Sequence, residues 1–230
     1  MTTEPVALDN GQKAPSREGI FYGDGTVSHC APTSKVQDGV SPDCVWFLMR
    51  AAYGQEMKAF DYLVDKEGIA EVFCPQWMQE RTVGGKKVKK LVSILPNALF
   101  VRSTQKALRG YVGVPPLTYF HHYYQPYKDE EGRDIENGRK PIVIPDSQML
   151  SFRKWLEADV EDKIYMNDTF LFKRNDLVRV REGDFEGFTG HVVRLKGQTR
   201  VGVNIEGVGF ICTTYIPKHC LEVIDNREED

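Results

Sequence analysis

The chain has 230 residues, of which 41% are hydrophobic and 27% are charged, and its formal net charge is −3. These values exclude a wholly disordered chain and allow one or two domains. No apolar run is long enough to cross a membrane, and the N-terminus lacks the apolar core of a secretory signal, so we expect a cytoplasmic protein. The near-neutral charge argues against a protein that coats nucleic acid with its whole surface, but it is compatible with a local basic patch.

The residues that usually carry catalysis or metal binding form no motif in this chain. The 5 cysteines are odd in number and include no C-x-x-C pair, so neither a disulfide framework nor a zinc site is expected. The histidines form no H-E-x-x-H pair, and no G-x-S-x-G, Walker A or G-x-G-x-x-G motif occurs. We therefore expect no enzymatic activity, no metal and no cofactor.

Charge and composition divide the chain into regions. The net charge is −3 over residues 1–43, +3 over 44–160, −2 over 161–172 and +1 over 173–225. Residues 1–43 are rich in Gly, Pro, Ser, Thr and Asp without a sustained period, which indicates a flexible extension. Its one apolar cluster, Ile20-Phe21-Tyr22, leaves open that a short segment docks onto the next domain.

A first domain is expected over 44–160, beginning with a buried strand at 45–49 that is apolar on both faces. Apolar residues at helical spacing predict a helix from 57 to 66. The segments that follow are interpreted as a strand at 69–74, a hairpin of 77–82 with 88–94 around Gly84-Gly85-Lys86-Lys87, a strand at 99–101, a short helix at 105–109 and a strand at 117–120.

The end of this domain combines a loop with a helix. Residues 125–141 are loop-like in composition, and Ile142-Val143-Ile144 is a short extended piece. Pro145-Asp146-Ser147 supplies capping chemistry for a helix that carries Met149, Phe152, Trp155 and Leu156 on one side. The order of elements predicts a small α+β sandwich, with the helices on one side of a largely antiparallel sheet.

A second pattern begins near residue 172. Leu177, Arg179 and Arg181 alternate with Val178 and Val180, and similar alternation recurs in 201–205, 210–212 and 221–223 between frequent glycines. Several short strands in so few residues predict a small β-barrel over 172–225. The acidic segment 161–171 is interpreted as the linker between two domains, and 226–230 as an acidic tail.

The most specific motif is the stretch from Asp176 to Leu195, DLVRVREGDFEGFTGHVVRL. Its order is strand, turn, aromatic loop, glycine and strand, with Gly190 at a place where a tight bend would admit no Cβ. It resembles a KOW motif, the core of an SH3-like barrel found in NusG-type transcription factors and some ribosomal proteins. On this resemblance alone, the expected partner is nucleic acid or a ribonucleoprotein.

The upstream domain carries a second resemblance. Trp46-Phe47-Leu48 followed by Gly54-Gln55-Glu56 and a helix resembles the opening of the NusG N-terminal domain. The segment Leu95-Pro-Asn-Ala-Leu-Phe-Val101 resembles the matching segment of the specialised paralogue RfaH, and the basic hairpin precedes it as in the family. The long extension and the Tyr215-Ile-Pro ending look most like UpxY-type antiterminators of Bacteroides capsular-polysaccharide operons.

The resemblance implies a surface for RNA polymerase. In the family, an apolar patch of the N-terminal domain docks onto the polymerase clamp. The matching positions here are Arg50, Leu95, Pro96, Ala98 and Phe100. The patch is poorer in aromatic anchors than the family's, because Ala98 and Leu95 stand where the family has Tyr and Phe. The alternative is that Leu95 and Phe100 are simply core residues.

The resemblance also implies contacts with the displaced non-template DNA strand. The matching positions are Tyr53, Gln55, Lys58 and Arg109. Gln55 and Arg109 could bond base edges, Lys58 could neutralise phosphate and Tyr53 could stack on an unpaired base. Lys86 and Lys87, with Lys89 and Lys90, form a basic hairpin suited to lie near duplex DNA. Ordinary solvated side chains are the alternative in each case.

The family's C-terminal barrel meets a small-subunit ribosomal protein or the terminator Rho. The candidate contacts here are Arg179, Arg181, Phe185 and Phe188. The first hypothesis is therefore a non-enzymatic transcription elongation and antitermination factor that binds RNA polymerase and suppresses pausing or termination. The alternatives are a KOW-type RNA-binding or ribosome-associated protein, and a regulator that sequesters NusG.

Overall fold

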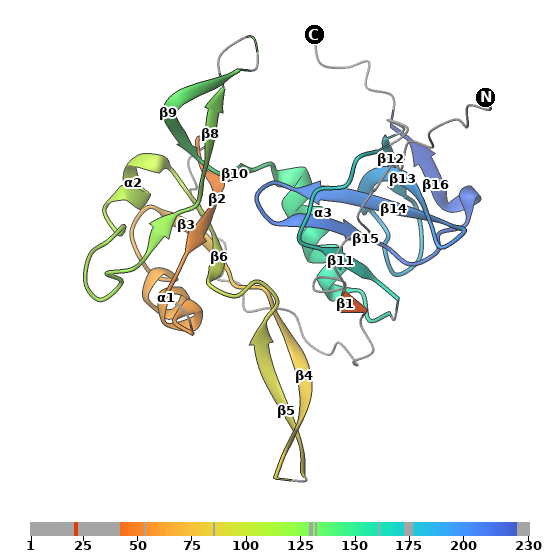
Figure 1. Cartoon of the computed structure of the whole chain (residues 1–230), viewed down its shortest axis with the longest axis horizontal. Helices are drawn as coiled ribbons and strands as arrows, with labels where there is room; N and C mark the ends of the chain where they lie inside the picture. The colour runs from red at the N-terminus through yellow and green to blue at the C-terminus, as the bar shows by residue number, and fades with distance from the viewer. Residues whose placement is uncertain are drawn as a thin grey trace, which may run out of the picture.

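The computed structural model describes residues 21–22, 42–52, 54–84, 86–128, 131, 133–160, 162–172 and 177–224. Two sheets, each with its own strand order, lie on either side of helix α3 (Asp146–Glu157), as Figure 1 shows. Most of the extension 1–43, the residue Tyr53 and the tail 226–230 fall outside the described residues. Among the described helices, none combines the length and the apolar character needed to span a membrane.

The N-terminal sheet is antiparallel throughout. Its strands run in the order β10 (Val143–Ile144), β2 (Val45–Arg50), β6 (Ala98–Ser103) and β3 (Ile69–Phe73), and β7 (His121–His122) also pairs with β2. The central strand β2 is buried along four consecutive residues, as its apolar run predicts for a strand covered on both faces. The antiparallel α+β class expected from the sequence is therefore present.

Helices cover both faces of this sheet, which corrects the expectation that all lie on one side. Phe47 and Met49 pack with α1 (Glu56–Leu63) and α2 (Gln105–Arg109), while Trp46 and Leu48 pack with α3. Neighbouring residues of a strand point to opposite faces, so β2 divides its apolar residues between two cores. An all-apolar strand requires such double cover, and the expected one-sided arrangement would have left half of it exposed.

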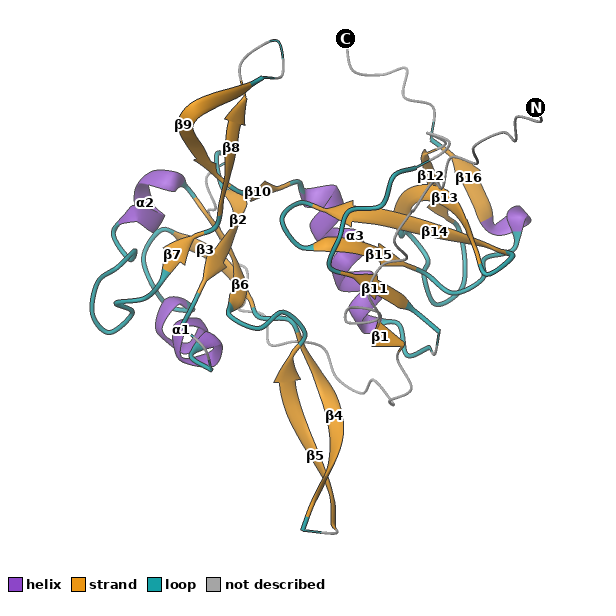
Figure 2. Ribbon diagram, in the orientation of Figure 1, coloured by secondary structure: helices purple, strands orange, loops and turns teal. Residues whose placement is uncertain are grey.

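Two hairpins project from the N-terminal sheet in opposite directions (Figure 2). One consists of β4 (Gln76–Val83) and β5 (Lys86–Ser93), as the glycine-containing tip predicted. The other consists of β8 (Tyr124–Lys128) and β9 (Asp134–Pro141), where we expected a loop. The polar, proline-containing composition of residues 125–141 shows no strand pattern, so the sequence did not indicate this hairpin. The strand expected at 117–120 is also wrong, because these residues form a turn before β7.

The C-terminal sheet has seven antiparallel strands in the order β1-β11-β15-β14-β13-β12-β16. The pairings follow an open path, so they do not by themselves close the expected barrel. The strands are β1 (Phe21–Tyr22), β11 (Ile164–Met166), β12 (Leu177–Val180), β13 (Thr189–Leu195), β14 (Gln198–Ile205), β15 (Gly209–Cys212) and β16 (Leu221–Val223), with the 3-10 helix η1 (Lys218–Cys220) before β16.

Two strands of this sheet lie in segments expected to be a linker and a flexible extension. The strand β11 lies within 161–171, the expected linker, and pairs with β15. Phe21 and Tyr22 pair with β11, so a short piece of the extension does dock, but onto the C-terminal sheet and not onto the next domain in the chain, as the alternative expected. Gly190 does lack room for a Cβ, but the cause is the close approach of β14 to β13 and not a bend: the Cβ would lie 2.5 Å from the Gly202 carbonyl oxygen.

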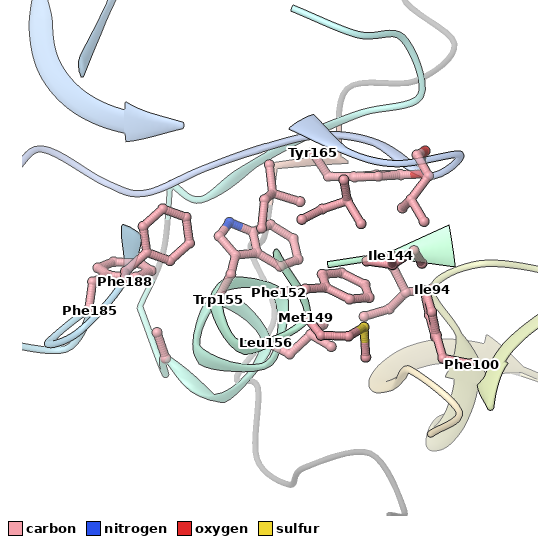
Figure 3. Packing of buried hydrophobic residues seen from close by; sticks show 14 of the residues in the cluster. Ile94, Phe100, Ile144, Met149, Phe152, Trp155, Leu156, Tyr165, Phe185 and Phe188 are labelled. Atoms are coloured by element: carbon pink, nitrogen blue, oxygen red, sulfur yellow. Dashed lines mark hydrogen bonds between the residues drawn. The ribbon is translucent and has the colours of Figure 1, made fainter. Parts of the chain in front are cut away.

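One hydrophobic core spans both sheets, with α3 at its centre. Phe152 packs on Phe73 and Phe100 of the N-terminal sheet, with ring centroids 6.1 and 5.6 Å apart, as Figure 3 shows for Phe100. On the same helix, the Trp155 indole N–H donates a 2.9 Å hydrogen bond to the carbonyl oxygen of Cys212 in β15. One apolar side of α3 therefore packs against both sheets.

Candidate functional site

A pocket of about 390 Å³ opens beside the N-terminal end of α1. The loop before the helix and the first turns of the helix form one wall, and the segment 116–120 forms the other. The lining residues are Ala51, Ala52, Gln55, Lys58, Ala59, Pro116, Leu117, Thr118, Tyr119 and Phe120. Two of the four residues predicted to contact the non-template strand, Gln55 and Lys58, therefore share one pocket.

The pocket combines a small-residue wall with a few exposed polar groups. Alanines at 51, 52 and 59 keep it open, because larger side chains there would fill it. Gln55 and Lys58 are exposed, and Tyr119 has 72% of its surface exposed. An amide, an ammonium group and an aromatic ring can bond a base edge, neutralise a phosphate and stack on a base, respectively. These three side chains offer groups of the kinds that contact a base and a phosphate.

Arg109 lies at the end of α2 and is not among the residues that line the pocket. The Thr104 hydroxyl caps this helix by accepting a 3.2 Å hydrogen bond from the Ala107 N–H. Arg109 is exposed and near His122, whose pKa is lowered by burial, by Arg109 and by His121. Tyr53 lies outside the described residues. Of the four residues predicted to contact the non-template strand, the structure thus brings Gln55 and Lys58 together in one pocket and places Arg109 outside it.

The residues predicted to bind polymerase divide into an exposed pair and a buried set. Arg50 and Pro96 are exposed, whereas Leu95, Ala98 and Phe100 are buried and belong to the core shared with α3. The alternative that Leu95 and Phe100 are core residues is therefore correct. Ala98 is a core residue as well. The prediction that these three side chains form part of a surface patch is therefore wrong, because they lie in the core beneath the surface.

The turn that carries Pro96 is held from α1. The buried Glu56 carboxylate accepts a 2.7 Å hydrogen bond from the Asn97 N–H, and Asn97 adopts a positive φ of 66°. The Asn97 carbonyl oxygen in turn accepts a 2.8 Å bond from the Ala51 N–H. Arg50 and Pro96 therefore sit on a fixed corner of the sheet, next to the loop that forms the pocket wall.

The β4–β5 hairpin presents lysines at its tip, away from both sheets (Figure 1). Lys86 and Lys87 are exposed at the start of β5. The side chains of Lys89 and Lys90 lie outside the described set. The hairpin tip is thus a cationic projection whose reach comes from the length of its two strands.

The predicted partner contacts of the C-terminal region are also divided. Arg179 and Arg181 are exposed, and Arg181 pairs with Glu222 at 3.1 Å. Phe185 and Phe188 are buried, with their rings 6.0 Å apart in edge-to-face contact (Figure 3). Burial corrects the prediction that these two rings form a surface. They pack inward because the turn between them folds back, with the Gly187 N–H bonded to the Val180 carbonyl oxygen at 2.7 Å.

The sequence did not single out Pro116, Thr118 or Tyr119 as site residues. They come from a loop about 60 residues beyond α1 in the chain, and nothing in their local pattern links them to it. The aromatic cluster from Tyr119 to Tyr124 was visible, but only the fold separates the exposed Tyr119 from the buried Phe120.

Comparison with known families addresses the N-terminal sheet. Residues 45–153 match the NusG family model, whose description is "Transcription termination factor nusG". The match begins at the first residue of β2 and ends inside α3, so it covers the whole N-terminal sheet and the pocket. It supports a NusG/RfaH-like family for this segment. No curated protein matches the chain.

The matched family acts in transcription. The family is one of transcription elongation and antitermination factors, not of enzymes, and its members generally bind RNA polymerase. The residues beyond 153, including the C-terminal sheet, lie outside the match. The predicted resemblance to NusG is therefore confirmed for the N-terminal segment at the level of the family.

Proposed function

We propose that the chain is a non-enzymatic, cytoplasmic transcription elongation and antitermination factor that binds RNA polymerase at selected operons. The observation that carries the proposal is the NusG match over 45–153, which includes the pocket and the Arg50–Pro96 corner. Polysaccharide-biosynthesis operons are the proposed targets, on the UpxY-like resemblance of the long extension and the Tyr215-Ile216-Pro217 ending.

The proposed polymerase contact is the exposed corner formed by Arg50 and Pro96. Leu95, Ala98 and Phe100 act from beneath it, because their burial fixes the turn and the end of β2. A rigid corner loses little conformational entropy on binding, which favours docking through a small number of exposed side chains. The contact is poor in aromatic anchors, so we expect weaker docking than in relatives that have them.

The proposed nucleic-acid contact is the pocket beside α1, with an unpaired base of the non-template strand as its occupant. Lys58 would neutralise a neighbouring phosphate, Gln55 would bond the base edge and Tyr119 would stack on the ring. Arg109 would contact the strand outside the pocket. Lys86 and Lys87 would lie against duplex DNA.

The proposed role of the C-terminal sheet is that of an SH3-like KOW barrel. Its support is the motif between Asp176 and Leu195 and the five consecutive antiparallel pairings that link β16, β12, β13, β14, β15 and β11. The exposed Arg179 and Arg181 are the proposed contacts for a small-subunit ribosomal protein or Rho. The buried Phe185 and Phe188 would shape this surface without touching the partner.

In vitro transcription on a template that carries the chain's own operon leader tests the proposal. Wild-type protein should shorten pauses and raise readthrough several-fold, and Lys58→Ala or Arg109→Ala should reduce recruitment at the pause. Lys106→Ala, an exposed lysine of α2 outside the pocket, is the matched control and should behave as wild type.

The same assay separates the rival hypotheses. Unchanged pausing and readthrough, with no binding to core polymerase, would contradict the proposal. Binding to ribosomes in place of polymerase would instead favour a ribosome-associated KOW protein.

A further inference from the structure

A cluster of three metal-ligating side chains lies at one end of the C-terminal sheet, away from the pocket and outside the NusG match. Glu182 follows β12 by two residues, and His219 and Cys220 belong to η1 just before β16. The strands β12 and β16 pair with each other, and the Arg181 N–H donates a 2.8 Å bond to the Cys220 carbonyl oxygen. Backbone bonding therefore fixes the two segments side by side before any ligand is present.

The ligand atoms already lie near the spacing of a coordination shell. Cys220 Sγ is 3.2 Å from Glu182 Oε1, and His219 Nε2 is 3.9 Å from the same oxygen. One ligand atom from each of the three residues lies within 4.8 Å of the others. In a tetrahedral zinc site with bonds of about 2.0–2.3 Å, ligand atoms are separated by roughly 3.3–3.8 Å. The two distances from Glu182 Oε1 lie close to this range, one just below it and one just above it.

We propose that Glu182, His219 and Cys220 bind one divalent transition-metal ion, and that Zn²⁺ is the ion best suited to them. A thiolate and an imidazole favour zinc over Mg²⁺ or Ca²⁺, which prefer oxygen ligands only. Three protein ligands leave the fourth position to water. Cys220 is buried, while Glu182 and His219 are exposed, so the ion can enter from solvent.

Binding requires one proton transfer and no redox step. The Cys220 thiol now donates its proton towards the Glu182 carboxylate. The metal takes the place of that proton, which passes to solvent, while the neutral imidazole supplies its lone pair. The resulting ion would join the loop after β12 to the chain before β16. It would thus cross-link the edge of the C-terminal sheet, a role independent of the proposed transcription function.

Metal titration of the full chain, stripped of metal, tests the site. Zn²⁺ should bind with a stoichiometry of one and raise the thermal unfolding midpoint. Co²⁺, used as a spectroscopic probe, should give a thiolate-to-cobalt charge-transfer band. Cys220→Ser should abolish this band, and His219→Ala or Glu182→Gln should weaken Zn²⁺ binding by about tenfold or more, since even the loss of a supporting outer group costs that much.

Two variants outside the cluster are the controls. Cys44→Ser removes a different thiol and His121→Ala a different imidazole, and both should keep wild-type binding. A cobalt band that survives Cys220→Ser, or the absence of stoichiometric Zn²⁺ binding by folded wild-type protein, would overturn the proposal. If Cys220→Ser does not fold, the test uses His219→Ala, because His219 is exposed and its replacement should not disturb the fold. Undiminished Zn²⁺ binding by folded His219→Ala would then overturn the proposal.

Discussion

Lys163 is a lysine whose side chain the fold buries. Its amine donates hydrogen bonds of 2.8 and 2.6 Å to the carbonyl oxygens of Trp155 and Ala158 at the end of α3. These carbonyls have no partner inside the helix, so the amine serves as a C-terminal cap. Burial nevertheless lowers the pKa of Lys163 to about 8, against an attraction from Asp159 that raises it.

This pKa predicts that stability rises with pH. Between about pH 8 and 10.5 the unfolded chain binds more protons at Lys163 than the folded chain, so the free energy of unfolding increases with pH in that window. Below about pH 8 both states carry the proton and the full cost of burying the charge is present. At 1.36 kcal/mol per pKa unit, wild type should gain about 1–2 kcal/mol relative to Lys163→Met between roughly pH 7 and 9.5.

Urea unfolding of both proteins across that range measures the gain. The Met side chain keeps the length and apolar packing of Lys163 but cannot titrate, so other groups contribute equally to both curves and cancel in the difference. A pH-independent difference between the two proteins would show that Lys163 keeps its ordinary pKa in the fold.

At the scale of elements, alternation was a reliable guide where one face of a strand meets solvent. In β12, Val178 and Val180 are buried while Arg179 is exposed, as the period of two predicts. It failed for the β8–β9 hairpin, because its strands contain Pro126 and Pro141 and are stabilised by pairing with each other. None of the side chains described in these strands is buried, so their sequence carries no alternation of apolar and polar residues.

The residues of the pocket also divide into those that the sequence could predict and those that it could not. Gln55 and Lys58 could be predicted from the segment that opens the NusG-like domain, because both lie in one short stretch of chain. Tyr119 could not be, because its place opposite α1 depends on the course of the chain between α2 and β7. Long-range neighbours of this kind arise from packing, which no local pattern records.

The β4–β5 hairpin leads to a prediction about DNA binding. Its lysines should contribute through release of counterions, which is independent of sequence. Replacing Lys86 and Lys87 by Gln should weaken binding to duplex DNA equally for unrelated sequences. It should also reduce the slope of log K against log salt by up to about 2, near 0.9 for each phosphate that a lysine no longer neutralises. Fluorescence anisotropy at several salt concentrations measures this slope.

The control for the hairpin is a double replacement of exposed lysines elsewhere. Lys196 and Lys218 lie at the C-terminal sheet, and their replacement by Gln removes the same net charge from the chain. A slope reduced equally by both pairs would mean that overall charge, and not the hairpin, binds DNA.

At the scale of the whole molecule, the main finding is that the two sheets share a core. Ser151 and Thr189 exchange hydrogen bonds between α3 and β13, with the Ser151 hydroxyl donating at 2.9 Å and the Thr189 N–H at 3.2 Å. The helix pattern of Met149, Phe152, Trp155 and Leu156 predicted an apolar side. That this side would serve a second sheet was not visible, because a helix stripe does not identify what covers it.

The turn between β14 and β15 carries a direct contact between the sheets. Gly207 lies in this turn with a positive φ of 70°, and a Cβ there would lie 2.7 Å from Ile142 and 3.0 Å from Leu48, both in the N-terminal core. The neighbouring Glu206 N–H also bonds to the Gln148 side chain of α3 at 2.9 Å. A side chain at residue 207 would therefore require the Ile142 and Leu48 side chains of the N-terminal core to shift.

Gly207→Ala should therefore weaken the contact between the sheets while leaving the pairing within each intact. Gly197→Ala is the matched control, because Gly197 has a similar φ of 76° but no atom within 4 Å of its added Cβ. Both variants strain the backbone by about 1 kcal/mol, and overpacking should cost Gly207→Ala roughly 1–3 kcal/mol more in the free energy of unfolding. Urea unfolding followed by tryptophan fluorescence measures the difference, since Trp155 lies at this junction. Equal losses for the two variants would mean that the sheets do not stabilise each other through this turn.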